Sequence, residues 1–347
     1  DTRPAEAKQT TKFINHLKPK TTMTYLENSK QYTGSDLENI FFRPMLTGES
    51  AQDLGVRVLY NMPQPTHVQL WDGQRNILQK FTSAGWAGGK AATKYEKTVN
   101  LNRVKAELGF SAANYFSMVY EKVSSLVNTH MDDLSGTELE QAETALFKQA
   151  LAENIRVTMW IGDTSAASGY NTFDGLLKRI NGLVDDDGVY NFSYQAAALE
   201  DPAYAVELFD KLWAGADPRI PGLKADDRLA YFVSSDIYRL YEKYLDAKGA
   251  DAAYADAMNG RRTLAYHGIP VVDVRLGSYL GATSFRQSFV MLTDRRNLVL
   301  AVNTADMPGN EVRMWYNPDE MENRQRAVFM AGTQILDEAL ISFAYKQ

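Results

Sequence analysis

Two short motifs contain residues that could bind phosphate or a metal cation. Gly-Gly-Lys at 88–90 shares two positions with a phosphate-binding loop, but that loop requires glycine where Ala84 stands and serine or threonine where Ala91 stands. Strand-like sequence flanks the motif on both sides, so we predict an ordinary loop. Asp-Asp-Asp-Gly at 185–188 could attract a cation, yet a calcium loop needs glutamate six positions after the glycine, where this chain has Tyr194. An acidic surface turn is the favoured interpretation, with weak cation binding as the alternative.

The residues that most often act as nucleophiles or metal ligands are scattered along the chain. There is no cysteine, which excludes disulfides and thiolate zinc sites. Gly-Asp-Thr-Ser at 162–165 lacks the second glycine of a nucleophile elbow. The adjacent carboxylates at 132–133 and 226–227 lie in polar stretches, where such pairs are usually solvated. The histidines are too far apart to suggest a metal site, and packing or turn roles are favoured for all four, which are His16, His67, His130 and His267. We therefore predict no catalytic residue, no cofactor and no metal.

Composition excludes several broad classes of protein. The chain has 347 residues, of which 45% are hydrophobic and 23% charged, so it can bury a large core and is not typical of a disordered chain. A net charge of −6 disfavours a dedicated nucleic-acid-binding protein, since phosphate affinity requires clustered lysine and arginine. No apolar run approaches the length that spans a bilayer, so we expect no membrane partner. The first residue, Asp1, is a possible processed N-terminus.

The first third of the chain predicts an arm followed by a projecting hairpin. Residues 1–34 are polar and rich in lysine and threonine, and we interpret them as an extended arm that becomes ordered by lying on a neighbour. Strand-like alternation begins at 56, and Asp72-Gly73 after 68–71 is a hairpin-turn signal with a return strand at 76–81. A long strand with one register break follows at 97–110.

The period of the hydrophobic residues then becomes helical. A continuous apolar stripe, with Phe147, Leu151, Ile155 and Met159 four residues apart, predicts a helix from Thr137 to Ile161, about 37 Å long. After Gly162 the pattern indicates a compact α/β region. It predicts helices at 204–214 and 236–247 and strands at 229–233, 269–272, 289–292, 299–302, 311–316 and 327–331, before an apolar stretch from 333 to 345 that we expect to return to the first body.

In their order, these features resemble the HK97-fold major capsid proteins of tailed bacteriophages. Local matches are Lys-Ala-Glu-Leu-Gly-Phe-Ser at 105–111, and Trp-Ile-Gly-Asp at 160–163 followed by Phe-Asp-Gly-Leu-Leu at 173–177. Phe173-Asp174 stands where the family usually has a proline. Similar matches are the strand and helix at 229–249, the Leu-Ala-Tyr-His-Gly-Ile-Pro-Val-Val segment at 264–272, and the late strands at 289–302 and 311–345.

The resemblance implies an α+β, HK97-like capsid fold divided into five parts. These are an N-terminal arm (1–34), an extended hairpin loop with the first peripheral-domain strands (35–110), a peripheral domain with a long spine helix (111–162), an axial α/β domain (163–305) and a return to the peripheral domain (306–347). The hairpin tip at Asp72 and Gly73 would contact a neighbouring subunit.

The same resemblance implies a function. The chain would self-assemble as hexamers and pentamers into an icosahedral shell that encloses phage DNA, which it would meet by non-specific proximity. Further partners would be a portal and, in some phages, decoration or scaffolding proteins. The protein would be part of the virion capsid, assembled in the cytoplasm of a bacterial host, and Asp1 would fit removal of an N-terminal scaffolding segment.

Two alternative functions and one possible covalent link between subunits stay open at this point. An encapsulin-type nanocompartment shares the fold but encloses cargo enzymes instead of DNA. A soluble α/β enzyme would use the 163–300 region as its catalytic domain, although we find no convergent polar residues there. Some family members join subunits through a Lys-Asn isopeptide bond, for which Lys90 is a weak candidate.

Overall fold

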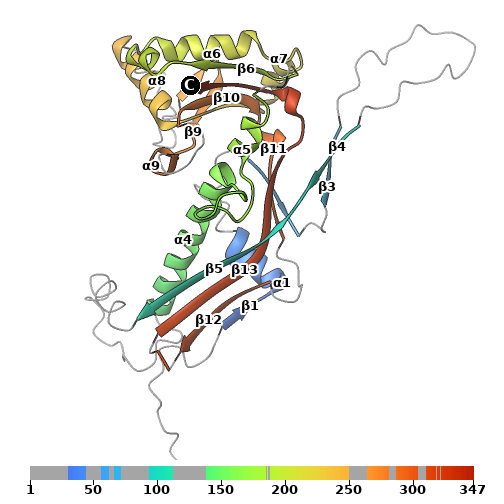
Figure 1. The fold of residues 1–347 in the computed structure, drawn as a ribbon, viewed down its shortest axis with the longest axis vertical. Helices are drawn as coiled ribbons and strands as arrows, with labels where there is room; N and C mark the ends of the chain where they lie inside the picture. The colour runs from blue at the N-terminus through green and yellow to red at the C-terminus, as the bar shows by residue number, and fades with distance from the viewer. Residues whose placement is uncertain are drawn as a thin grey trace, which may run out of the picture.

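The fold was obtained as a computed structural model, and its described residues form two six-stranded β-sheets, placed one after the other along the long axis of the molecule, and a two-stranded ribbon (Figure 1). The structure describes residues 30–43, 56–61, 66–71, 94–111, 138–184, 186, 188–249, 264–280, 287–303, 310–317, 319–320 and 322–347. Short helical segments connect the larger elements. They are α1 (Gly34–Asp36), η1 (Leu37–Phe42), η2 (Ala196–Glu200), α7 (Ile220–Leu223), η3 (Lys224–Asp226), α9 (Gly277–Leu280), η5 (Arg295–Asn297) and η6 (Glu338–Leu340).

The first sheet combines strands from both ends of the chain. Its order is β1-β12-β13-β11-β2, and β5 pairs with the opposite edge of β13. All neighbours are antiparallel except β11 and β2. The strands are β1 (Lys30–Tyr32), β2 (Arg57–Tyr60), β5 (Asn102–Ser111), β11 (Leu298–Asn303), β12 (Glu311–Asn317) and β13 (Glu322–Ile335).

The helix predicted from Thr137 to Ile161 is present as α4 (Glu138–Ile161), and it covers one face of this sheet. Along β13, buried and partly exposed residues alternate because successive side chains point to opposite faces of a strand. The inward residues, with Phe329 at the centre, share one core with the helix residues Phe147, Leu151 and Ile155. The four-residue spacing of these apolar residues is therefore what fixes the face of α4 that is buried.

A two-stranded ribbon stands apart from both sheets. It consists of β3 (Thr66–Trp71) and β4 (Lys94–Val99), which are antiparallel, and β4 leads into β5 after a break at Asn100 and Leu101. The sequence predicts one register break, between Arg103 and Val104, but the break lies earlier, at Asn100 and Leu101, and β5 is continuous across 103–104. Trp71 pairs with Lys94, so the described partner of β3 is β4 and not the return strand expected at 76–81. That return strand, Asp72, Gly73 and Lys90 lie outside the described residues. The arm to residue 29 and Asp1 also lie outside them.

The second sheet is covered on both faces. Its order is β6-β14-β10-β7-β9-β8. Helices α6 (Tyr204–Ala214) and α8 (Ser235–Ala247) pack on one face, and α5 (Leu176–Asn181) with the end of α4 packs on the other. The strands are β6 (Tyr190–Tyr194), β7 (Leu229–Val233), β8 (Leu264–Tyr266), β9 (Ile269–Asp273), β10 (Phe289–Asp294) and β14 (Ile341–Lys346).

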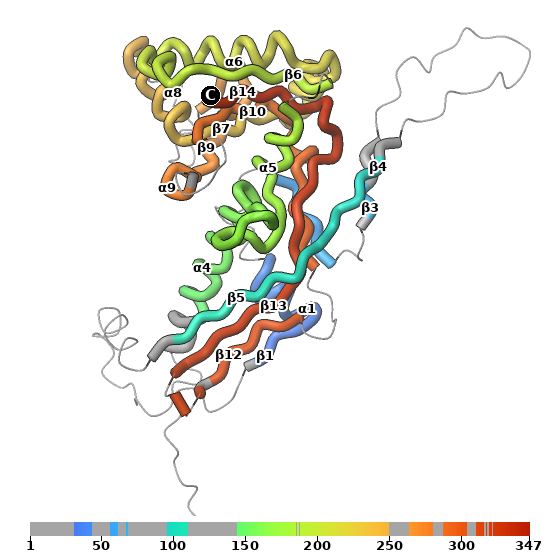
Figure 2. Tube along the Cα trace, in the orientation of Figure 1, coloured from blue at the N-terminus to red at the C-terminus, as the bar shows by residue number. Residues whose placement is uncertain are grey.

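Strand pairing corrects two of the predicted boundaries. Residues 341–346 do not return to the first body: β14 lies inside the second sheet, between β6 and β10. Conversely, β11 falls within the predicted axial region but pairs with β13 and β2 of the first sheet. Both strands are buried along most of their length, and a continuous apolar strand does not reveal which neighbour it pairs with. Figure 2 shows the resulting path, in which β13 leads from the first sheet to β14 of the second.

Candidate assembly surfaces

Of the residues that the sequence marked as possible chemical groups, several lie within the described ranges. Gly188 N donates to Asp186 Oδ1 at 2.8 Å, which closes a local turn. The predicted turn at His267 is confirmed: with Gly268 it forms the two-residue link between β8 and β9, and both residues have positive φ, 48° and 78°. His67 lies on β3, with its Nδ1 3.2 Å from Thr98 Oγ1. His16 and His130 lie outside the described residues.

Within the described ranges, no three histidine, aspartate or glutamate residues are close enough together to hold a metal ion. In the same ranges, no helix is both long and apolar enough to cross a bilayer.

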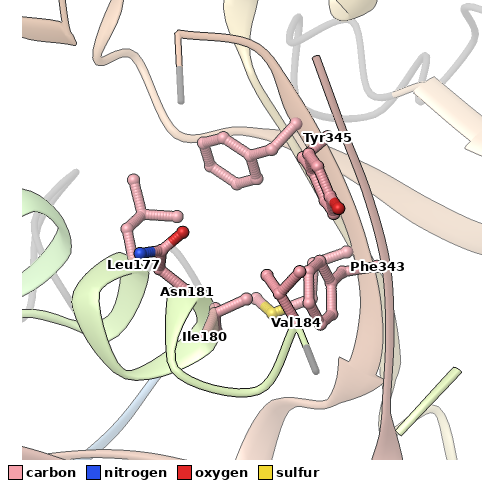
Figure 3. A pocket seen from close by; sticks show the side chains of 8 residues that line it. Leu177, Ile180, Asn181, Val184, Phe343 and Tyr345 are labelled. Atoms are coloured by element: carbon pink, nitrogen blue, oxygen red, sulfur yellow. The ribbon is translucent and has the colours of Figure 1, made fainter. Parts of the chain in front are cut away.

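A small cavity lies between α5 and the second sheet (Figure 3). Its volume is about 30 Å³, and its walls are mainly apolar side chains from α5, β10 and β14, with Asn181 as the polar exception. Pockets for small-molecule substrates are usually about ten times larger or more. We therefore interpret this cavity as a packing gap at the joint between the two halves of the molecule. It is lined by Leu177, Ile180, Asn181, Val184, Phe289, Met291, Phe343 and Tyr345.

After α4 the chain folds back on itself, so that the motif at 160–163 meets the motif at 173–177. Gly175 N donates to Gly162 O at 2.8 Å. A Cβ atom on Gly175 would lie 2.6 Å from Gly162 N, so only glycine permits this approach. Lys178 Nζ bridges Asp163 Oδ1 at 2.7 Å and Asp174 Oδ1 at 2.6 Å. The hydrogen bond from Lys178 helps lower the pKa of Asp163 to about 2, and the reciprocal bond to Asp163 raises the pKa of Lys178.

A buried arginine ties α4 to the second sheet. The Arg156 side chain is almost fully buried and donates from Nη1 to Val274 O at 2.7 Å, directly after β9. Its Nε donates to Glu153 at 2.9 Å, and Tyr279 OH donates to the same carboxylate. Because a buried guanidinium must keep its partners, this network holds the end of α4 against the segment after β9.

The open edge of β5 borders a wide groove. The groove measures about 510 Å³ and is lined by five consecutive β5 residues, 104–108, and by one flank of α4. Among the described strands, none pairs with this edge of β5. Unpaired edges are where another strand can add, so this groove is a candidate contact surface.

The face of the first sheet opposite α4 carries arginines around a tryptophan. The Arg313 and Arg326 guanidinium carbons each lie 5.8 Å from the centre of the Trp315 ring. Arg326 also pairs with Glu311. Tryptophan and arginine are the residue types most enriched at the centres of protein interfaces, so this face is a second candidate contact surface. We did not predict either surface, although the charged residues Glu322, Arg324 and Arg326 occupy alternate positions in the sequence.

Taken together, a long helix on a mixed sheet, a separate two-stranded ribbon and a second α/β unit define the fold of bacteriophage capsid proteins. A chain in the structure of the satellite phage P4 procapsid with its size determination (Sid) protein has this fold. It matches with a TM-score of 0.55 and 10% identity, over 87% of this chain and 96% of that one. The predicted HK97-like capsid fold is thereby confirmed.

Two further capsid structures are similar at lower scores and add nothing to the fold assignment. The capsid of a native GTA particle gives a TM-score of 0.46 at 15% identity, over 86% of this chain and 89% of that one. The capsid of the myovirus phage XM1 gives 0.46 at 13% identity, over 85% and 91%. The sequence matches no protein-family profile and no curated protein.

Proposed function

We propose that this chain is the major capsid protein of a tailed bacteriophage, assembling as hexamers and pentamers into an icosahedral shell around phage DNA. The observation that carries the proposal is the fold shared with a chain of the P4 procapsid over 87% of this protein. The comparison spans both sheets, and it covers nearly the whole of the other chain, 96%. The candidate surfaces described above give the subunit places at which copies could meet.

In this proposal the parts of the molecule have geometric roles. The helix α4 stiffens the first sheet and holds the two ends of the molecule at a fixed separation, as its ties to both sheets allow. The ribbon, with its tip near Asp72 and Gly73, reaches a neighbouring subunit. The second α/β unit gathers around the local symmetry axis.

Other partners follow from the same role. A portal and scaffolding or decoration proteins would bind the shell, and DNA would lie close to it without a dedicated binding site, in keeping with the net charge of −6. Assembly would take place in the cytoplasm of the bacterial host, before DNA enters.

Electron microscopy of the purified protein tests the proposal. We expect icosahedral shells, or free hexamers and pentamers, under assembly conditions. A protein that stays monomeric across those conditions would contradict it. Particles isolated from an infected host are expected to protect double-stranded DNA from nuclease, whereas particles that contain only a cargo protein would identify an encapsulin-type nanocompartment instead.

A further inference from the structure

The end of β13 lies between the ribbon and the second half of the molecule. Residues 332–335 are the last of β13 in the first sheet, and residues 336–340 lead from there through η6 into β14 of the second sheet, as the path in Figure 2 shows. In an extended chain, alternate side chains point to opposite sides. Here the even-numbered residues meet the ribbon and the segment that follows it, whereas the odd-numbered residues meet α5 and the second α/β unit.

The first two even-numbered positions contact the backbone of the segment that leads from β4 to β5. A Cβ atom at Gly332 would lie 2.2 Å from Asn100 O, so the absence of a side chain lets the two backbones cross. Two residues later, Gln334 Nε2 donates to Thr98 O at 2.9 Å. This amide therefore binds the backbone at the end of strand β4, before the chain enters β5.

The next two even-numbered positions contact ribbon side chains. Glu338 Oε1 lies 2.6 Å from Lys97 Nζ of β4. Leu336 is buried in a small apolar cluster at the base of the ribbon, together with Val68, Val99, Leu101, Val299 and Ala301. The ribbon base is thus held by close backbone approach, an amide hydrogen bond, apolar packing and an ion pair, spaced two residues apart.

The odd-numbered residues contact α5 and the second α/β unit. Thr333 Oγ1 donates to Asp174 O, just before α5. Ile335 belongs to the main core, which includes α5 and one face of the second sheet. Asp337 Oδ2 accepts from Arg219 Nη1 at 2.8 Å, at the start of α7.

The backbone at the crossing is itself fixed by a buried asparagine. Asn297 Oδ1 accepts from Asp337 N at 2.7 Å, and Asn297 Nδ2 donates to Asp337 O at 2.8 Å. The Asn297 side chain is almost fully buried, so loss of these bonds would leave buried polar groups unpaired. Glu338 therefore projects from a rigid position.

We infer that residues 332–338 are a mount that fixes the direction of the β3–β4 ribbon relative to the second α/β unit. An isolated two-stranded ribbon is marginal by itself, so contacts at its base decide its direction. Gly332, Gln334, Leu336 and Glu338 are positioning residues. In a closed shell each copy must present its ribbon at the same angle, and this step of the inference rests on the proposed function.

A charge swap between the ribbon and its mount tests the inference. Glu338→Lys or Lys97→Glu alone places like charges together and is expected to raise hydrogen exchange several-fold in β3 and β4. Melting should change little, since exposed ion pairs contribute little to stability. The double variant Lys97→Glu with Glu338→Lys is expected to restore slow exchange. A matched control is Lys211→Glu, which breaks a similarly exposed pair with Glu207, also at 2.6 Å, on α6.

A second variant tests whether contacts of residues 332–338 with the second α/β unit also affect the ribbon. Asp337→Asn weakens the contact with Arg219 on the far side from the ribbon, and we expect faster exchange in β3 and β4 as well as around α7. Unchanged ribbon exchange in Glu338→Lys, failure of the charge swap to restore it, or a change confined to α7 in Asp337→Asn would overturn the inference.

Hydrogen exchange is measured on the unassembled protein, so it does not depend on shells. If the wild-type protein forms no shells, only the proposed function is contradicted. If shells form, Glu338→Lys is expected to give particles of irregular size, and the double variant is expected to return them to the wild-type size.

Discussion

At the scale of single residues, the crossing of Gly162 and Gly175 is the most constrained point after α4. Each glycine lies where a Cβ atom would overlap the backbone of the other segment. Neighbouring residues supply the surrounding bonds, because Asp163 N donates to Tyr170 O at 3.0 Å and so closes the intervening loop. The motif that suggested a capsid protein is thus explained by backbone approach.

We expect Gly175→Ala to destabilise the protein by about 3 kcal/mol or more, because the new methyl group cannot be placed without moving backbone on both sides. Its Cβ would lie 2.6 Å from both Gly162 N and Trp160 O. Chemical denaturation measures the change. Gly222→Ala is the control, since a Cβ there meets nothing within 4 Å. Equal stability of the two variants would show that the crossing is loose.

At the scale of elements, sequence periodicity predicted helices and buried strands well but predicted pairing poorly. The predicted bounds of α6 and β7 match the structure residue for residue, because each has a clear local pattern. For β13 only residues 327–331 were predicted out of Glu322–Ile335. The polar residues Asn323 and Gln325 occupy inward positions and break the apolar alternation. The neighbours of β14 depend on contacts far along the chain, which local patterns do not encode.

The ribbon gives a prediction at this scale. Trp71 and Lys94 are directly paired, so an Asn-Gly turn can replace residues 72–93 and close the ribbon as a two-residue hairpin. We expect a folded protein, with a melting temperature close to that of the wild type, that forms no stable shells in electron micrographs. Replacement of the same residues by a glycine-serine segment of equal length separates the effect of sequence from that of length. If the short variant forms normal shells, residues 72–93 are not needed for assembly and the prediction is wrong.

At the scale of the whole molecule, one hydrophobic core joins the two sheets. It contains Phe329 of the first sheet, Phe232 of the second and Trp160 at the end of α4. The Trp160 ring is fully buried, with its centre 5.6 Å from that of Phe232, and no group in the described ranges accepts a hydrogen bond from its Nε1. The groove beside β5 combines residues that are far apart in the chain, which is why the sequence alone did not indicate it.

We expect Trp160→Ala to cost about 3–5 kcal/mol and to split a single unfolding transition into two, because it removes the largest side chain between the halves. Calorimetry measures both effects. Trp160→Phe is the control, since it keeps a ring and removes the unpaired N–H, and it should retain one transition at nearly the wild-type temperature. A single transition in the alanine variant would mean that the remaining contacts are sufficient to couple the sheets.

The position of β14 between β6 and β10 also affects when a newly made subunit becomes able to assemble. Its pairing with β6 joins residues about 150 positions apart, a separation that slows folding because a long loop must close first. A growing chain on the ribosome can complete α4 and α6 but has a gap in its second sheet until residues 341–346 have emerged. The order of synthesis thus delays assembly, because a partly made chain cannot present a complete second sheet to neighbouring subunits.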